Sequence, residues 1–534
     1  MWGLFILNIN NHFPLVGSKR IMCNEINHQP NPAPPHRGAG GLSEKGSKAY
    51  LFSIVLVAVL GGLLFGYDTA VISGAEKGLQ AFFLGAPDFV YTDTVHGITS
   101  SSALLGCIIG ASLSGFMAGK FGRKKSLAIA GVFFFLSALG SYCPEFLLFS
   151  YGEPCFNLLI AFNFYRILGG VSVGLASAIC PMYIAEVAPS NMRGTLVSWN
   201  QFAIIFGQLV VYFVNFMILG EHTQPVIEKL GEAVYQVSSS SDPWTVTTGW
   251  RYMFGSEAFV AAMFTVLVCF VPESPRYLAL IGEDDRSLRV LSKINGLAKA
   301  REILTEIKNT VEVKSERLFS FGVMVIFVGV MLSVFQQAVG INAVLYYAPR
   351  IFESMNMGNP MVQTVIMGIV NISFTLVAVF TVEKLGRKPL LIWGSVGMAV
   401  GALGVAMSNI VTVDPVVPVV SIMVYSASFM FSWGPICWVL IAEIFPNTIR
   451  SQAVAIAVAF QWIFNFIVSS TFVPMYNMRL GEMGDRFGHC FAYALYGIVC
   501  IAAAIFVARL VPETKGKSLE DMTALWRTRN KSKR

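Results

Sequence analysis

Charge is scarce in this sequence, and that scarcity excludes an ordinary soluble fold. Only 13% of the 534 residues are Asp, Glu, Lys or Arg, 55% are hydrophobic, and the mean hydropathy is +0.63. A soluble globular domain carries about 25% charged residues. The net charge of +7 does not indicate a nucleic-acid partner, because the basic residues lie in short clusters between apolar runs. The composition predicts a polytopic membrane protein in a lipid bilayer.

The sequence also lacks the motifs of a membrane enzyme or an ATP-driven pump. Gly516-Lys517-Ser518 ends like a phosphate-binding loop, but Val511 stands where that loop requires a glycine. His96 and His489 are isolated, with no second ligand at metal-binding spacing. We therefore expect no enzymatic activity, no metal site and no cofactor.

Residues 1 to 48 contain neither a run long enough to span a membrane nor the cleavage site of a signal peptide. They are polar and rich in Pro, Gly, Asn and His, so we expect a disordered extension. Met1 and Met22 are alternative starts. Of the nine cysteines, Cys143 and Cys155 flank one short loop. Free thiols are favoured over a disulfide there, because spacing alone does not fix a disulfide.

Twelve apolar runs follow from residue 49 onward, each about as long as a membrane-crossing helix requires. The loop after the second run holds Lys120, Arg123, Lys124 and Lys125 without an acid, and the stretches 273–317 and 512–534 are also rich in Lys and Arg. Positively charged loops stay in the cytoplasm. We expect an all-α protein of the cytoplasmic (inner) membrane, with both termini and the central linker in the cytoplasm.

The central linker, residues 273 to 317, mixes charged residues with regularly spaced apolar ones such as Leu288, Leu291 and Ile294. This spacing is typical of short amphipathic helices lying under a bundle of membrane helices. A solvated spacer without helices is the alternative.

An internal repeat divides the chain into two halves. Gly-Lys-Phe-Gly-Arg-Lys-Lys at 119–125 returns as Glu-Lys-Leu-Gly-Arg-Lys-Pro at 383–389, and Ala-Glu-Val-Ala-Pro at 185–189 returns as Ala-Glu-Ile-Phe-Pro at 442–446. Pro272-Glu273-Ser274 likewise returns as Pro512-Glu513-Thr514. We expect a six-helix half at 49–272, a helical linker at 273–317, a second six-helix half at 318–511 and a tail at 512–534. Two such halves are the architecture of transporters that bind substrate at mid-membrane.

These motifs, together with Arg166-Ile-Leu-Gly-Gly, resemble the sugar porter family of the major facilitator superfamily. The resemblance covers residues 49 to 525 and implies the major facilitator fold and proton-coupled sugar import through alternating access. We expect the protein to be a monomer. D-xylose is the first substrate it implies. A proton-coupled hexose transporter for glucose or galactose, and an uncoupled sugar uniporter, are the alternatives.

Amide side chains inside the apolar runs are suited to a neutral polyol, because each supplies a hydrogen-bond donor and an acceptor without a charge. One amide alone is more often a contact between helices, but adjacent Gln336-Gln337 followed by Gly340 and Asn342 is hard to explain by packing. The resemblance implies the same sugar site. The expected binding residues are Phe65, Gln201, Gln336, Gln337, Asn342, Tyr346, Asn371, Trp433, Gln461 and Trp462, and further amides lie nearby at Gln208 and Asn465.

Asp68 ends the long uncharged run 49–67, and Arg166 is the lone charge between Cys155 and Ala185. Charges in such runs avoid lipid and pair with one another, so we expect Asp68 to pair with Arg166 and to be released by a proton. The resemblance assigns both residues to proton coupling. The alternatives are an acid solvated at its helix end and an arginine bound to backbone carbonyls. Glu257, close to Arg251, is expected to be solvated near the outer surface.

Charged residues of the repeated motifs lie at the expected cytoplasmic ends of the helices. We expect them to form a cytoplasmic gate, pairing across the two halves when the inside is closed. One exposed pair contributes only about 0 to 1 kcal/mol, so a network is required; solvation at helix ends is the alternative. The residues are Arg123, Glu186, Arg193, Glu273, Arg276, Arg387, Glu443, Arg450 and Glu513.

Overall fold

The computed structural model describes residues 43–146, 149–189, 192–229, 235–311, 318–355, 357–411, 413–446, 448–479, 483–515 and 519–531. Leu42–Arg534 forms one compact unit. The extension expected to be disordered falls outside the described residues over positions 1–42. Its last part differs from that expectation: the Ser47 backbone N–H donates to the carbonyl of Lys293 at 2.9 Å, and the Ser47 side chain caps the helix that begins at Lys48.

Twelve helices in the described residues are long and apolar enough to cross a membrane, which confirms the number of predicted spans. Nine spans are single helices and three are interrupted. The first six spans, here called the first half, are α2 (Lys48–Leu84), α3 (Asp93–Phe121), α4 (Arg123–Tyr142), α5 (Phe156–Val187), α6 (Arg193–Leu219), and the series η1 (Thr245–Gly249), α7 (Trp250–Gly255) and α8 (Glu257–Phe270).

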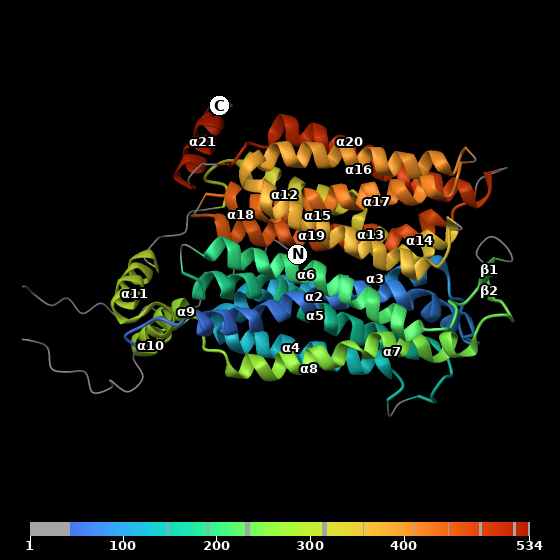
Figure 1. The fold of residues 1–534 in the computed structure, drawn as a ribbon, viewed down its shortest axis with the longest axis horizontal. Coiled ribbons are helices and arrows are strands. Elements are labelled where there is room, and N and C mark those ends of the chain that lie inside the picture. The colour runs from blue at the N-terminus through green and yellow to red at the C-terminus, as the bar shows by residue number, and fades with distance from the viewer. Residues whose placement is uncertain are drawn as a thin grey trace, which may run out of the picture. The chain divides into compact units, whose positions relative to one another are not determined.

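The last six spans form the second half, which Figure 1 shows above the first half. The seventh span is broken into α12 and α13, and the tenth into α17 and α18. The elements are α12 (Val323–Ala338), α13 (Ile341–Tyr346), α14 (Ala348–Ser354), α15 (Pro360–Leu385), α16 (Arg387–Ser408), α17 (Val416–Phe431), α18 (Trp433–Ile444), α19 (Arg450–Tyr476), α20 (Asp485–Leu510) and the tail helix α21 (Leu519–Lys531).

The linker between the halves forms the helices α9 (Pro275–Leu280), α10 (Asp284–Asn295) and α11 (Leu297–Val311), as its apolar spacing predicted. They lie at one end of the membrane helices, called the linker end below. At the opposite end, the hairpin end, β1 (Ile227–Lys229) pairs antiparallel with β2 (Tyr235–Val237), with Glu228 opposite Gln236 (Figure 1).

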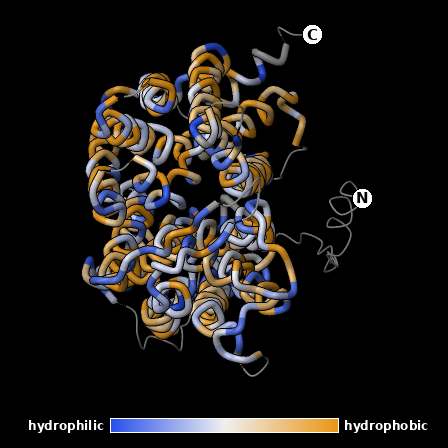
Figure 2. Tube along the Cα trace, turned by 90° about the vertical axis from the view of Figure 1, so that its right-hand side faces the viewer, coloured by the Kyte–Doolittle hydropathy of each residue, from blue (hydrophilic) through white to orange (hydrophobic). Residues whose placement is uncertain are grey.

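Large apolar side chains remain exposed along the membrane helices. Phe270, Phe380 and Trp393 are each at least 70% exposed. Figure 2, which looks onto the hairpin end, shows such hydrophobic residues along the helices of both halves. Soluble proteins rarely expose so much contiguous apolar surface, and here it is suited to contact with lipid tails. The chain is therefore a multi-pass membrane protein.

Candidate functional site

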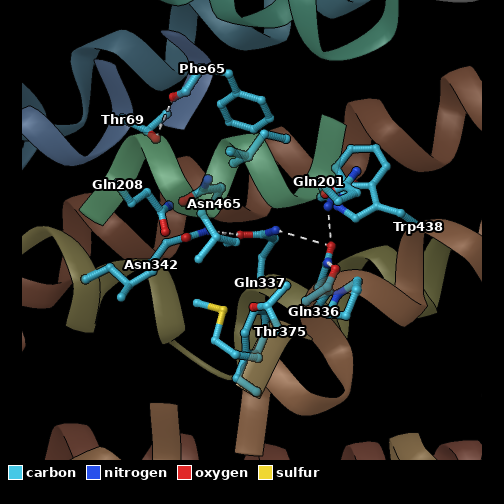
Figure 3. A pocket seen from close by; sticks show the side chains of 18 of the residues that line it. Phe65, Thr69, Gln201, Gln208, Gln336, Gln337, Asn342, Thr375, Trp438 and Asn465 are labelled. Atoms are coloured by element: carbon cyan, nitrogen blue, oxygen red, sulfur yellow. Dashed lines mark hydrogen bonds between the residues drawn. The ribbon is translucent and has the colours of Figure 1, made fainter. Parts of the chain in front are cut away.

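A cavity of about 760 Å³, counting the space at its mouth, lies between the two halves. Figure 3 shows side chains from several helices converging on it. Eight of the ten expected binding residues line it, and so do the further amides Gln208 and Asn465; the eight are Phe65, Gln201, Gln336, Gln337, Asn342, Tyr346, Gln461 and Trp462.

The amides of the cavity are joined in one network. Gln336 donates to the carbonyl of Trp433 at 3.1 Å, while its own side-chain oxygen accepts from Gln461 and, at 3.5 Å, from Gln337. The oxygen of Gln337 accepts from Asn342 at 2.5 Å (Figure 3). These bonds fix the orientation of each amide, so that the remaining donors and acceptors point in set directions before any ligand binds.

A break in the seventh span brings three of these amides together. Gly340 has a φ of +91°, and a Cβ at this position would lie 2.5 Å from the ring of Tyr496. Glycine alone tolerates both the left-handed backbone and the close approach. The break ends α12 just after Gln337 and restarts the chain as α13 just before Asn342.

Several buried polar atoms of cavity residues have no partner within the described chain. They are the side-chain oxygens of Gln208 and Gln461 and the indole nitrogen of Trp462. A buried polar group without a hydrogen bond costs about 1 to 3 kcal/mol. Two acceptors and one donor beside an aromatic pair, Phe65 and Trp462, whose ring centroids are 5.6 Å apart, fit the hydroxyls and the C–H face of a sugar.

The expectation that Trp433 lines the site is wrong. The Trp433 side chain is fully buried against α16, and its indole N–H donates to the Ser395 hydroxyl at 2.7 Å and the Leu391 carbonyl at 3.2 Å. The cavity is lined instead by Trp438, from the same sequence motif (Figure 3). The backbone turns at Ser432, where α18 begins. In the resulting orientation of α18, Trp433 contacts α16 and Trp438 lines the cavity.

Asn371 also lies outside the cavity lining, whereas Thr375, one helical turn further along α15, belongs to it. The oxygen of Asn371 accepts from the Ser426 hydroxyl at 2.6 Å, and its buried amide nitrogen has no partner in the described residues. Thr69 is a second lining hydroxyl that sequence reasoning missed, although it directly follows Asp68.

Asp68 and Arg166 form the expected ion pair. One guanidinium nitrogen of Arg166 lies 2.6 Å from an Asp68 carboxylate oxygen, and the other donates to the Asp68 carbonyl at 3.2 Å. Asp68 is completely buried, and α2 continues to Leu84, so the acid lies in the middle of its helix. The alternative of an acid solvated at a helix end is therefore excluded.

Glu257 corrects another expectation. It is 1% exposed, not solvated, and its carboxyl group lies near that of Asp68. One oxygen of each carboxyl has no partner among the described residues. The guanidinium of Arg166, which pairs with Asp68, also lies 4.9 Å from the centre of the Phe254 ring. Two buried carboxyl groups and one buried guanidinium therefore lie close together in the first half.

The repeated motifs build the same cluster twice at the linker end. In the first half, Arg123 donates to Glu186 at 2.6 Å, and Glu273 accepts from the backbone N–H of Arg123 at 2.9 Å. Gly122, with a φ of +86°, lies so close to Glu273 that a Cβ would be 2.3 Å from its carboxylate. The glycine of Gly-Arg-Lys is required for this approach.

In the second half, Arg387 pairs with Glu443 at 2.9 Å, and Glu513 accepts from the backbone N–H groups of Arg387 and Lys388 at 3.1 and 3.0 Å. Burial acts to raise the pKa of Glu513, but four backbone N–H donors hold it below its ordinary value. Gly386 repeats the role of Gly122, with a φ of +90°.

We expected these charged residues to pair across the two halves. In this conformation Arg123 and Arg387 instead pair with glutamates of their own half. Arg193 and Arg276 are exposed and make no ion pair within the described chain, while Arg450 is half-buried. Polar contacts between the halves gather instead at the hairpin end. There Arg350 lies 2.7 Å from Glu76, Lys77 pairs with Glu353, and Asn477 donates to Asp93 at 3.0 Å.

Cys143 and Cys155 are both free, as expected. No group of three or more potential metal ligands occurs among the described residues.

The sequence matches the Sugar (and other) transporter family over residues 54–526. It is 45% identical to the D-xylose-proton symporter of Escherichia coli, covering 91% of this chain and 97% of that one, and 34% identical to the glucose facilitated diffusion protein of Zymomonas mobilis, covering 91% and 100%. The solved inward-open structure of the E. coli xylose transporter has a TM-score of 0.76 at 45% identity and covers 89% of this chain and 100% of that one. These relatives are transporters, not enzymes. The chain therefore belongs to the Sugar (and other) transporter family and has the major facilitator fold.

Proposed function

We propose that the protein imports D-xylose together with protons across the cytoplasmic (inner) membrane by alternating access, as a monomer. The observation that carries the proposal is a buried acid–arginine pair directly beside an amide-lined cavity. Asp68 belongs to the pair, and the next residue, Thr69, lines the cavity. The 45% identity to the E. coli D-xylose-proton symporter supports the choice of sugar and of coupling ion.

The sugar is held by the cavity residues. Gln336, Gln337 and Asn342 offer a pre-oriented amide surface from the second half, and Gln201 and Gln208 face it from α6 in the first half. A sugar that bridges both surfaces draws the halves together when it binds. Binding energy is then available for the conformational change of transport.

The proton is held by the two carboxyl groups. When one proton is bound to Asp68 or Glu257, the remaining carboxylate charge is cancelled by the positive charge of Arg166. Without that proton, a net negative charge remains in a buried site. Loss of the proton therefore tightens the Asp68–Arg166 pair, and its return weakens that pair. Because the pair joins α2 to α5 next to the cavity, the proton biases the helices that line the sugar site.

We place the linker end in the cytoplasm, because the basic loop of Arg123, Lys124 and Lys125 lies there. The ion pairs at the hairpin end then close the cavity towards the outside, and the conformation faces inward. The likeness to an inward-open structure supports this assignment. When the cytoplasmic end closes, residues of the repeated clusters, with Arg193, Arg276 and Arg450, form the gate between the halves.

An uncoupled sugar uniporter, or a proton-coupled transporter of glucose or galactose, is the second candidate. This candidate is supported by the glucose facilitated diffusion protein of Zymomonas mobilis, which is 34% identical to this chain. A site distinguishes sugars that differ by one methylene-sized group by only about 1 to 3 kcal/mol, so cavity geometry alone does not separate a pentose from a hexose.

The test is uptake by proteoliposomes of radiolabelled D-xylose and glucose, each with the other as competitor. With an inward proton gradient of one pH unit, the wild type should accumulate D-xylose about tenfold if one proton accompanies each sugar, and a protonophore should abolish the accumulation. Asp68→Asn should still exchange labelled for unlabelled sugar but should not accumulate it. Accumulation by Asp68→Asn would refute the proton role.

Glu145→Gln is the matched control. Glu145 is also a buried carboxylate paired with an arginine of the first half, Arg251, at 2.6 Å, but neither residue lines the cavity. A folded Glu145→Gln protein should therefore accumulate sugar as the wild type does. If both variants lose accumulation equally, the effect follows from a broken buried ion pair rather than from proton coupling.

A further inference from the structure

A second buried cluster of titratable groups bridges the two halves at the hairpin end. Arg350, on α14, donates from two nitrogens to the two oxygens of Glu76, on α2, at 3.1 and 2.7 Å. The ring of His96, on α3, contacts the same carboxylate through Nε2 at 3.0 Å. Glu76 and His96 are 0% exposed. One carboxylate thus faces a guanidinium from the second half and an imidazole from the first half.

His96 is enclosed on its other sides. Its Nδ1 lies 3.1 Å from the Tyr91 hydroxyl, and its ring centroid lies 6.4 Å from that of Tyr347 in the second half. At the neighbouring Gly97, a Cβ would lie 2.2 Å from a backbone oxygen of Ser470 on α19, so the helices are in direct contact there. The imidazole is thus enclosed by residues of both halves.

The other charged and titratable groups facing the cluster are already engaged. Lys77 pairs with Glu353, and Asp93 accepts from Tyr235 at 2.5 Å and from Asn477 at 3.0 Å. Further groups around it are Gln80, which accepts from Arg350, the hydroxyl pair Ser354 and Tyr476, and the separate buried pair Glu145 and Arg251.

We propose that Glu76, His96 and Arg350 form a second proton-binding site, which opens the outer end of the transporter when the outside is acidic. The inference rests on the proposed function for the assignment of the hairpin end to the outside. The site is separate from the Asp68 pair, since its members join the two halves and do not line the sugar cavity.

The direction follows from the charges of the closed state. Arg350 already neutralises Glu76, so a proton on His96 would place a second cation in a site without water, whereas an imidazole in the open state is hydrated. A proton on Glu76 would leave Arg350 buried without its partner. Protonation at either residue therefore favours opening. A proton binds more tightly to the state in which its site is hydrated, and it shifts the equilibrium towards that state.

A hydrated imidazole titrates near about pH 6.5. If the closed state holds only the neutral ring, the ratio of outward-open to closed protein should rise about tenfold between pH 7.5 and pH 5.5. The measurement is double electron–electron resonance on purified full-length protein without sugar or gradient. Spin labels would be placed at Val90 and Ile410, exposed positions at the hairpin ends of the two halves, with the native cysteines replaced.

His96→Gln retains an amide for hydrogen bonding but does not titrate, so its distance distribution should not respond to pH. His222→Gln is the matched control, because His222 lies at the same end on an exposed loop with Asp242 as partner, and it should respond as the wild type does. Arg350→Gln is a second variant: without the competing cation, a protonated His96 is neutralised by Glu76, and acid should no longer open the gate.

The proposal is overturned if the wild type does not open on acidification, or if His96→Gln opens as the wild type does. Both results are independent of sugar coupling, because no transport is measured. Accumulation of sugar by Asp68→Asn would therefore refute the proposed function without affecting this measurement. An absent pH response here would refute the second proton-binding site without affecting the uptake result.

Discussion

Two tryptophans five residues apart on α18 give the sharpest test of the cavity. Trp438 lines the cavity, whereas Trp433 is buried against α16 and donates to Ser395 and Leu391. The same substitution, Trp→Phe, at each position removes an indole N–H and keeps an aromatic ring. The two variants should therefore fail in opposite ways: Trp438→Phe in sugar binding, and Trp433→Phe in stability.

The magnitudes follow from what each N–H does. Within the described residues the Trp438 N–H has no hydrogen bond, and it is available to a sugar hydroxyl in the cavity. Loss of one neutral hydrogen bond costs about 0.5 to 1.5 kcal/mol, which weakens D-xylose binding about 2- to 13-fold. At Trp433 the substitution removes the two hydrogen bonds from the indole N–H to the Ser395 hydroxyl and the Leu391 carbonyl, although the Ser395 hydroxyl still donates to Leu391 at 2.8 Å. At about 0.5 to 1.5 kcal/mol for each bond, the free energy of unfolding should fall by about 1 to 3 kcal/mol.

The assay is isothermal titration of D-xylose into purified protein, together with thermal unfolding of the same samples. Trp438→Phe should raise the dissociation constant and keep the melting temperature. Trp433→Phe should lower the melting temperature and keep the dissociation constant within about twofold, since Trp433 does not line the cavity and its indole N–H is bonded to Ser395 and Leu391. Equal loss of affinity in the two variants would refute the assignment of the cavity to Trp438.

Three further variants test other parts of the structure. Gln461→Leu removes an unpaired buried acceptor from the cavity and should weaken D-xylose binding about 5- to 150-fold in the same titration, whereas unchanged affinity would contradict the site. Gly340→Ala forces a side chain into a φ of +91° against Tyr496 and should abolish folded protein in size-exclusion chromatography; a well-folded variant would contradict the required break. Because the pKa of Glu513 is lowered in the folded protein, its carboxylate stabilises the fold above its ordinary pKa of about 4.5, and this stabilisation is lost as the pH falls from there through the lowered pKa. Glu513→Gln should therefore be less stable than the wild type at neutral pH and should lose less stability between pH 6 and pH 4. Thermal unfolding of the two proteins measures both differences.

Some site residues could be identified because a charge or an amide in an apolar helix needs a local explanation. Asp68 and Arg166 are each the lone charge of a long uncharged run, so their pairing follows from the cost of exposing either to lipid. The same reasoning failed for Glu257, because Arg251 is its nearest charge in sequence, whereas in the folded helices its neighbour is Asp68, 189 residues earlier.

The broken helices account for the other errors. In an unbroken helix the side on which a residue lies follows from its position in the sequence. The turn at Ser432 changes the orientation of the helix that follows, so this relation does not carry over from α17 to α18. Trp433 and Trp438 are therefore indistinguishable as cavity residues until the turn is known. Asn371 and Thr375 lie on one face of α15, and the depth of the cavity decides which of them lines it.

The sequence by itself determined the twelve spans, the repeat of the two halves and the amide-rich character of the site, because hydrophobic length and the cost of burying charge act on each segment locally. Only the tertiary structure decided which tryptophan meets the cavity, that Glu257 joins Asp68, and that Glu76, His96 and Arg350 meet across the halves. Arg350 lies 274 residues from Glu76. Contacts at such separations depend on how whole helices are rotated and packed against one another, and no local pattern of residues records that.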